Sequence, residues 1–164
     1  WLILLFIEEM FTGTALRHYE ATLASAIALT FFIPLIISSG GNSGSQSATL
    51  ITRALAVGDV EMRDALRVFL RELGQGLVLG AFLGAIGLGR ALMWGNGMDV
   101  AWVVAFTLLF VVITGTIVGA MLPLLFTRLG FDPAIASSPF VASLVDVAGI
   151  IIYFNIAIHV IGLG

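Results

Sequence analysis

Long apolar runs separated by short polar links are the feature that most constrains the fold of this chain. A helix needs about 20 apolar residues to cross the hydrocarbon core of a bilayer. Charged residues make up only 10% of the chain, whereas a soluble domain carries about 25%. The runs lack the two-residue alternation of membrane strands. The sequence therefore predicts an all-α membrane protein, one domain with five transmembrane helices, at residues 1–16, 21–39, 69–93, 100–125 and 133–161.

The arginines predict how these helices are oriented, because short cytoplasmic loops carry an excess of basic residues. All seven basic residues are arginines. Arg17 and Arg90 flank the links after the first and third predicted helices. The other five flank the links after the second and fourth: Arg53, Arg63, Arg67, Arg71 and Arg128. We therefore expect a multi-pass protein of the plasma or inner membrane, with its N-terminus cytoplasmic and its C-terminus external.

Composition excludes several classes of site. The chain has no cysteine, which excludes disulfides and cysteine-based metal or redox centres. No basic stripe of the kind that binds nucleic acid is present, and the net charge is only −3. The opening apolar run lacks the basic segment and cleavage site of a signal peptide. We therefore expect the lipid bilayer, and no nucleic acid, as a partner.

Asp146 is the most informative single residue. It lies thirteen residues past Pro133, or about 20 Å along a helix, which places it near the middle of the bilayer. An ionised group there is costly and normally faces a cavity or a partner. Small and polar residues share its face of the helix: Ala142, Ser138, Gly149 and Tyr153. The sequence favours a water-accessible functional carboxylate over the alternative, a neutral and hydrogen-bonded structural one.

A polar stretch, SSGGNSGSQSA at residues 38–48, follows the second apolar run. Ser38, Gly41, Asn42 and Ser45 have the spacing of one helical face. Pro34 and the glycines of the stretch are expected to weaken the helix and free carbonyl groups. Many oxygens without a fixed positive charge suit a hydrated cation and do not suit phosphate. A flexible interfacial loop is the alternative.

The two polar faces are expected to meet. With the predicted orientation, the second helix brings residues 38–45 toward the cytoplasmic side, and residues 138–146 cover the cytoplasmic half of the fifth. One Asp is a sparse site for a divalent cation, whereas two copies around a two-fold axis supply two carboxylates and a central pore. Mg²⁺ keeps much of its water and prefers octahedral oxygen, so such a site suits it. We therefore expect a homodimer.

Two further patterns concern packing and a second acidic position. Gly76, Gly80 and Gly84 recur at four-residue spacing, which lets helices approach closely in lipid. Glu8 and Glu9 lie inside the first apolar run and, as neighbours, cannot share one helical face. A dimer contact, a second ion site, or a protonated or interfacial position are the interpretations that we keep open for them.

Residues 34–55 (PLIISSGGNSGSQSATLITRAL) and 118–154 (VGAMLPLLFTRLGFDPAIASSPFVASLVDVAGIIIYF) resemble the membrane domain of the MgtE magnesium channels. The resemblance covers nearly the whole chain and keeps five spans in the same order. It implies a homodimeric Mg²⁺ channel whose pore is lined by the second and fifth helices. That family usually also has a cytoplasmic N-terminal domain and paired CBS domains that sense Mg²⁺. We expect these 164 residues to hold the membrane domain alone.

The resemblance also implies which residues meet the ion. Asp146 occupies the place of the pore aspartate that holds hydrated Mg²⁺, and Ala142 and Gly41 match positions that offer backbone carbonyls. Ser38 stands where the family pattern has glycine, and Ser45 and Ser138 stand where it has asparagine. The predicted metal-site residues are Asp146, Ala142, Gly41, Ser38, Asn42, Ser45 and Ser138.

Two other functions compete with passive permeation of Mg²⁺. One is Na⁺- or H⁺-coupled Mg²⁺ transport, with Glu8, Glu9 or Asp146 binding the coupling ion. The other is a rhomboid-like intramembrane protease, because residues 41–44 have the form Gly-x-Ser-Gly. A serine nucleophile at Ser43 needs a histidine base within hydrogen-bond reach. His18 and His159 are both predicted at the external side, so no enzymatic activity is expected.

Overall fold

The computed structural model describes residues 2–162, apart from the side chain of Ser25, and within that range every regular element is a helix. Four segments are long and apolar enough to cross a membrane: Ile27–Val57, Met62–Met93, Gly97–Arg128 and Ser138–Ile161. An all-α fold suited to a membrane is therefore confirmed. The first helix is 17 residues long, so a fifth span remains a prediction. Trp1, where the predicted first span begins, lies outside the described residues.

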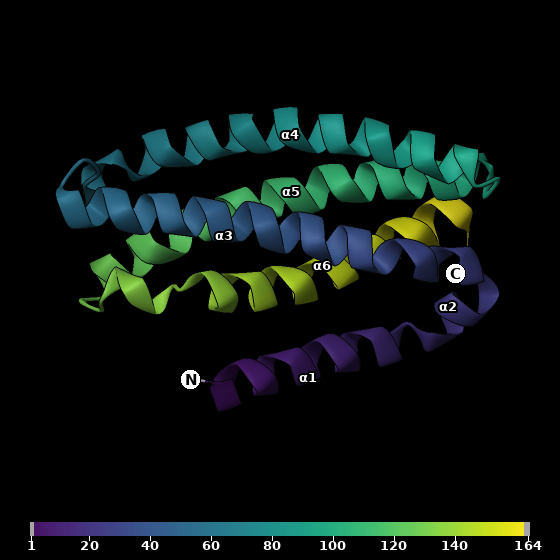
Figure 1. Ribbon diagram of the computed structural model, residues 1–164, viewed down its shortest axis with the longest axis horizontal. Helices are drawn as coiled ribbons and strands as arrows, with labels where there is room; N and C mark the ends of the chain where they lie inside the picture. Colours follow the sequence, from purple (N-terminus) through teal and green to yellow (C-terminus); the bar gives the residue numbers. More distant parts are fainter. Residues whose placement is uncertain (1, 163–164) are drawn as a thin grey trace.

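Four long helices run side by side, and α1 lies along one flank of the bundle (Figure 1). α5 is central, since it packs against α3, α4 and α6, while α1 packs against α6. The elements in chain order are α1 (Leu2–His18), α2 (Glu20–Ser25), the 3₁₀ helix η1 (Ile27–Phe32), α3 (Ile33–Val57), η2 (Met62–Asp64), α4 (Ala65–Met93), α5 (Gly97–Arg128), η3 (Pro133–Ile135) and α6 (Ser138–Ile161).

The second predicted span, 21–39, does not coincide with a single helix of the structure. Residues 20–32 form two short helices, α2 and η1, that meet at Ala26 in a non-helical conformation (φ −140°, ψ 72°). α3 then continues unbroken through the polar stretch to Val57, where Gly58 ends it with φ 79°. The flexible-loop alternative for 38–48 is therefore wrong. Pro34 does not weaken the helix, because it occupies the first turn, where its missing donor is not needed.

The start of the last helix also differs from the predicted start at Pro133. Asp132 Oδ1 accepts a hydrogen bond from the Ala134 backbone N–H at 2.8 Å, so it caps the short η3 turn. α6 begins only at Ser138, with Pro139 in its first turn. A helix running from Pro133 through Pro139 would lose a backbone bond and clash with the carbonyl four residues upstream. The third and fourth spans extend beyond their predicted bounds, as parts of α4 and α5.

Glycines set the distances between helices, as the four-residue spacing predicted. A Cβ at Gly80 would stand 2.8 Å from the Leu109 carbonyl oxygen, and one at Gly84 2.7 Å from that of Ala105. α4 and α5 therefore approach through their backbones. On the other side of α5, a Cβ at Gly115 would stand 2.6 Å from the carbonyl oxygen of Gly40 on α3.

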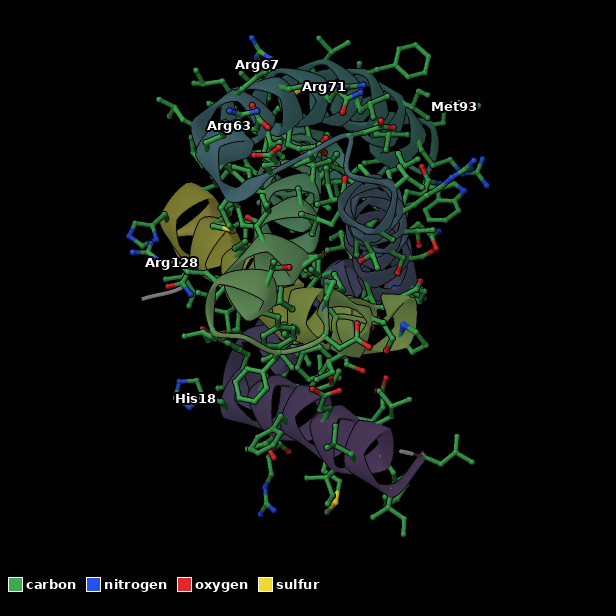
Figure 2. The ribbon with its side chains drawn as sticks, turned by 90° about the vertical axis from the view of Figure 1, so that its left-hand side faces the viewer. His18, Arg63, Arg67, Arg71, Met93 and Arg128 are labelled. Atoms are coloured by element: carbon green, nitrogen blue, oxygen red, sulfur yellow. The ribbon has the colours of Figure 1, made fainter. Side chains whose placement is uncertain are left out.

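Five of the seven arginines belong to one end of the bundle, in the last turns of α3, in η2, at the start of α4 and at the end of α5. Figure 2 views the molecule from that end, with Arg63 of η2 and Arg67 and Arg71 of α4 in the upper part of the view. The remaining two, Arg17 and Arg90, lie in the last turns of α1 and α4. Which end is cytoplasmic remains a prediction from this asymmetry.

Candidate cation site

Asp146 lies against the glycine-rich part of α3. The residue is half-buried, and its Oδ1 is buried without a hydrogen-bond partner among the described residues. A Cβ placed on Gly41 would stand 2.9 Å from this oxygen and 3.5 Å from the Ala142 Cβ. Because Gly41 has no side chain, α3 can pack directly against the carboxylate. The structure brings together three of the predicted site residues, Asp146, Ala142 and Gly41.

The outer face of α3 beside this contact is polar. Ser38, Asn42 and Thr49 are exposed, and Asn42 Nδ2 donates a hydrogen bond to Ser38 Oγ at 3.2 Å. Gly40 and Gly44, by contrast, are buried against α5 and α6. The polar side chains are therefore on the surface of a single chain, although they belong to a helix suited to a membrane. Such a face is expected to border water or a partner.

Ser45 and Ser138 meet near the start of α6, although 93 residues separate them in the sequence. The Ser45 hydroxyl donates a hydrogen bond to the Ser138 backbone carbonyl at 3.0 Å. A surface hollow of about 380 Å³ lies here, lined by Ser45, Gln46, Thr49, Leu50 and Ser138. The hollow continues the polar face of α3 toward the arginine-rich end of the bundle.

The polar face of α6 ends at Asp146 and does not extend outward as the helical spacing predicted. Tyr153 is 1% exposed, and its hydroxyl donates a hydrogen bond to the Leu29 carbonyl at 2.8 Å. Gly149 packs against Val111 and Ile36. Both residues belong to the apolar packing around α5 and η1. The candidate site is therefore confined to the half of α6 that begins at Ser138.

Sequence reasoning missed Glu72. This carboxylate is 5% exposed on α4, and its Oε2 accepts a hydrogen bond from the Ser47 hydroxyl of α3 at 2.7 Å. Its position four residues before Gly76 places it on the same face as the glycines that contact α5. That spacing was the available signal, and it was overlooked because Glu72 follows Arg71 at the start of an apolar run.

Glu8 and Glu9 face different surroundings, as their adjacency predicted. Glu8 lines a hollow of about 300 Å³ between α1 and α6, together with Ser143 and apolar side chains. The Glu8 Oε2 atom and the Thr12 hydroxyl, one turn apart on α1, are buried without partners among the described residues. Glu9 is exposed.

Ser43 has no catalytic geometry. Its hydroxyl donates a hydrogen bond to the Ser39 carbonyl at 2.8 Å, within its own helix. His159 Nδ1 lies 2.7 Å from the Asn155 carbonyl oxygen. His159 is also thirteen residues beyond Asp146 on α6, about 20 Å along the helix axis. It is therefore far from the part of α3 that contacts Asp146 and contains Ser43.

The chemistry of the site is that of hard oxygen ligands. Residues 2–162 contain no group of three or more His, Cys, Asp or Glu side chains placed to hold a metal ion. The polar faces of α3 and α6 offer one carboxylate, several hydroxyls and an amide. These groups suit a cation that keeps part of its water shell and accepts few direct ligands.

Known proteins resemble this chain over most of its length. The family model described as "MgtE: Divalent cation transporter" matches residues 33–156. Proteins called "Magnesium transporter MgtE" align over 157 residues, 96% of the chain, with 45% identity in Thermus thermophilus, 36% in Enterococcus faecalis and 32% in Bacillus subtilis. The alignment covers 35% of each relative, so the chain spans about a third of the length of the curated relatives it matches.

Proposed function

This chain belongs to the MgtE family of divalent cation transporters, and from that premise we propose that it forms the membrane pore of a magnesium channel. The family is one of transporters and not of enzymes. The pore passes hydrated Mg²⁺ between two copies of the chain, related by a two-fold axis. α3 and α6 of each copy line it, and Asp146 is its main ion site. The arginine-rich end is cytoplasmic, with α1 as a fifth span.

The unpartnered Asp146 Oδ1 atom beside the exposed polar face of α3 is the observation that carries this proposal. A carboxylate oxygen that no described residue bonds keeps its capacity to accept hydrogen bonds, and because the side chain is only half-buried, it can turn toward the water shell of a cation. A second copy supplies a second carboxylate and covers the polar face, which would otherwise border lipid. Two carboxylates plus waters are an appropriate set for Mg²⁺.

Permeation requires binding that is favourable enough for entry and weak enough for exit. In the proposed pore, the negative charge of the two Asp146 side chains draws the cation in. The Gly41 and Ala142 carbonyls and the hydroxyl and amide oxygens of α3 and Ser138 contact its water shell. Because those contacts are made through water, no single one holds the ion tightly. The ion then moves down its electrochemical gradient without a coupled step.

Divalent-cation flux in liposomes tests the proposal. Asp146→Asn keeps the size of the side chain and removes its charge, and we expect Mg²⁺ influx to fall at least about tenfold, the factor that corresponds to about 1.4 kcal/mol. Asp146→Ala should abolish it. Asp99→Asn makes the same chemical change at an exposed position, and its flux should equal that of the unmodified protein. Full influx with unchanged Mg²⁺ dependence in both Asp146 variants would sink the proposal. Parallel measurements with Mn²⁺, Co²⁺ and Ca²⁺ define the selectivity.

The hollow between α1 and α6 favours a second candidate, Na⁺- or H⁺-coupled Mg²⁺ transport. Glu8 lines this hollow. Its buried Oε2 atom and the buried hydroxyl of Thr12, one turn along α1, lack partners among the described residues, as expected of groups that bind a small cation. Coupled transport requires Mg²⁺ flux to stop when the Na⁺ and H⁺ gradients are collapsed. It also requires Glu8→Gln to alter the dependence of flux on one of those gradients. The channel proposal expects neither effect.

A further inference from the structure

Glu72 of α4 connects to α3 and α5 on the side of the proposed pore wall that faces away from the pore. Its carboxylate accepts a hydrogen bond from Ser47 of α3 at 2.7 Å, and its backbone carbonyl accepts one from the Thr116 hydroxyl of α5 at 3.1 Å. One turn further along α4, a Cβ at Gly76 would stand 2.7 Å from that same Thr116 hydroxyl oxygen. The missing side chain at Gly76 therefore lets Thr116 reach Glu72.

Ser47 and the polar face of α3 point in opposite directions. Each residue of an α-helix turns by about 100°, so Ser47 is rotated by about 200° from both Ser45 and Thr49. Ser47 is buried, whereas Thr49 is exposed at the hollow. The hydrogen bond between Ser47 and Glu72 therefore constrains α3 on the side that faces away from the proposed ion path.

The contact between α3 and α5 at their glycines is made by close packing and, among the described residues, contains no directional polar side chain. Gly115 and Gly119 of α5 meet the backbone of Gly40 and Gly44, and the Val111 side chain of α5 packs against Gly40. Glycine pairs of this kind allow close approach. A directional hydrogen bond in a buried, low-dielectric setting is the kind of interaction that selects one rotation.

We propose that Glu72 is a positioning residue, which sets the rotation of α3 through Ser47 and so directs Ser45 and Thr49 toward the ion path. The proposal rests on the proposed function, because it assigns Glu72 a role in the same pore. It assigns no contact between Glu72 and the ion. The Ser45 bond to the Ser138 carbonyl then ties the rotated helix to α6 at the inner end of the pore.

Thiol labelling measures this rotation without relying on transport. The chain has no cysteine, so Thr49→Cys and Ala48→Cys each introduce a single thiol on adjacent residues. Thr49 is exposed and Ala48 is 1% exposed, so a charged, water-soluble thiol reagent should label only the first. Adding Glu72→Met, which keeps the length of the side chain and removes the acceptor, should slow labelling at position 49 about tenfold and speed it at position 48.

Conservative rescue separates positioning from general packing. Glu72→Gln retains an acceptor oxygen for the Ser47 hydroxyl, so its labelling pattern should match that of the unmodified protein. Ser47→Ala removes the donor and should reproduce the effect of Glu72→Met, with no further change in the double variant. Ser47→Ala also serves as the test if Glu72→Met does not fold. Unchanged labelling in folded Glu72→Met or Ser47→Ala, or identical behaviour of the Gln and Met variants, overturns the proposal.

Mg²⁺ flux in the same variants connects the rotation to the pore. Glu72→Met should lower the preference for Mg²⁺ over Ca²⁺ and raise the Mg²⁺ concentration at half-maximal flux, while Glu72→Gln keeps both. If labelling shifts in Glu72→Met and Ser47→Ala while Asp146→Ala keeps full flux, the positioning role is supported and the pore assignment is overturned. If labelling is unchanged in Glu72→Met and Ser47→Ala while Asp146→Ala abolishes flux, the pore assignment is supported and the positioning role is overturned. The two proposals therefore fail separately.

Discussion

At the residue scale, the candidate site depends on the contact between Gly41 and the Asp146 carboxylate. A Cβ at Gly41 would stand 2.9 Å from the buried carboxylate oxygen, which is closer than van der Waals contact allows. The atom it meets is the end of a side chain, so the carboxylate can rotate away while the helices stay in place. A substitution at Gly41 should therefore change the orientation of the Asp146 carboxylate more than the stability of the bundle.

Gly41→Ala is accordingly expected to weaken transport in a folded protein. Rotating the carboxylate away from the added methyl group is a local change that costs the folded bundle less than a rigid, overpacked site would, at about 1–3 kcal/mol, but it moves the charge out of its place in the proposed ion path. Mg²⁺ flux at low concentration should therefore fall about tenfold, while the thermal unfolding midpoint in detergent changes little. Gly74→Ala is the matched control, since nothing lies within 4 Å of a Cβ there. Flux equal in the two variants would show that Gly41 does not orient the carboxylate.

At the element scale, the contact between α3 and α5 has different consequences. A Cβ at Gly115 would stand 2.6 Å from the Gly40 carbonyl oxygen and 3.2 Å from the Gly44 backbone nitrogen. These are backbone atoms, so relief requires the two helices to separate. Replacing glycine by alanine therefore displaces a side chain at Gly41, whereas at Gly115 it changes the spacing of two helices.

Gly115→Ala should lower the stability of the folded bundle by about 1–3 kcal/mol or more. The measurement is the unfolding midpoint in detergent, followed by tryptophan fluorescence. Gly13→Ala on α1, where nothing lies within 4 Å of a Cβ, provides the control and should leave the midpoint unchanged. A Gly115→Ala protein as stable as this control would mean that α3 and α5 do not pack as closely as described.

At the scale of the whole molecule, one copy presents its polar α3 face outward, and the proposed dimer covers it. Asn42 is exposed on that face. Val78 of α4 is 71% exposed on another helix, and α4 is not part of the proposed pore wall. The two positions therefore report on different surfaces of the bundle.

A short bis-maleimide reagent should link two copies that carry Asn42→Cys, in membranes and at low protein density. Copies that carry Val78→Cys should remain unlinked, because α4 lies away from the proposed two-fold axis. The absence of native cysteine makes each introduced thiol unique. Linkage at position 78 with none at position 42 would place the dimer contact on α4 and contradict the proposed pore.

The sequence alone determined the membrane class, the approximate spans, the packing role of the glycines, and Asp146 and the α3 face as candidates. Hydropathy and helical period depend on neighbours in the chain, so local pattern suffices for them. Only the tertiary structure decided that Gly41 meets Asp146, that Tyr153 turns into the core, and that Glu72 reaches Ser47. Those outcomes depend on how helices distant in sequence are rotated against one another, and the packing of side chains against glycines and a few long-range hydrogen bonds determine that rotation together.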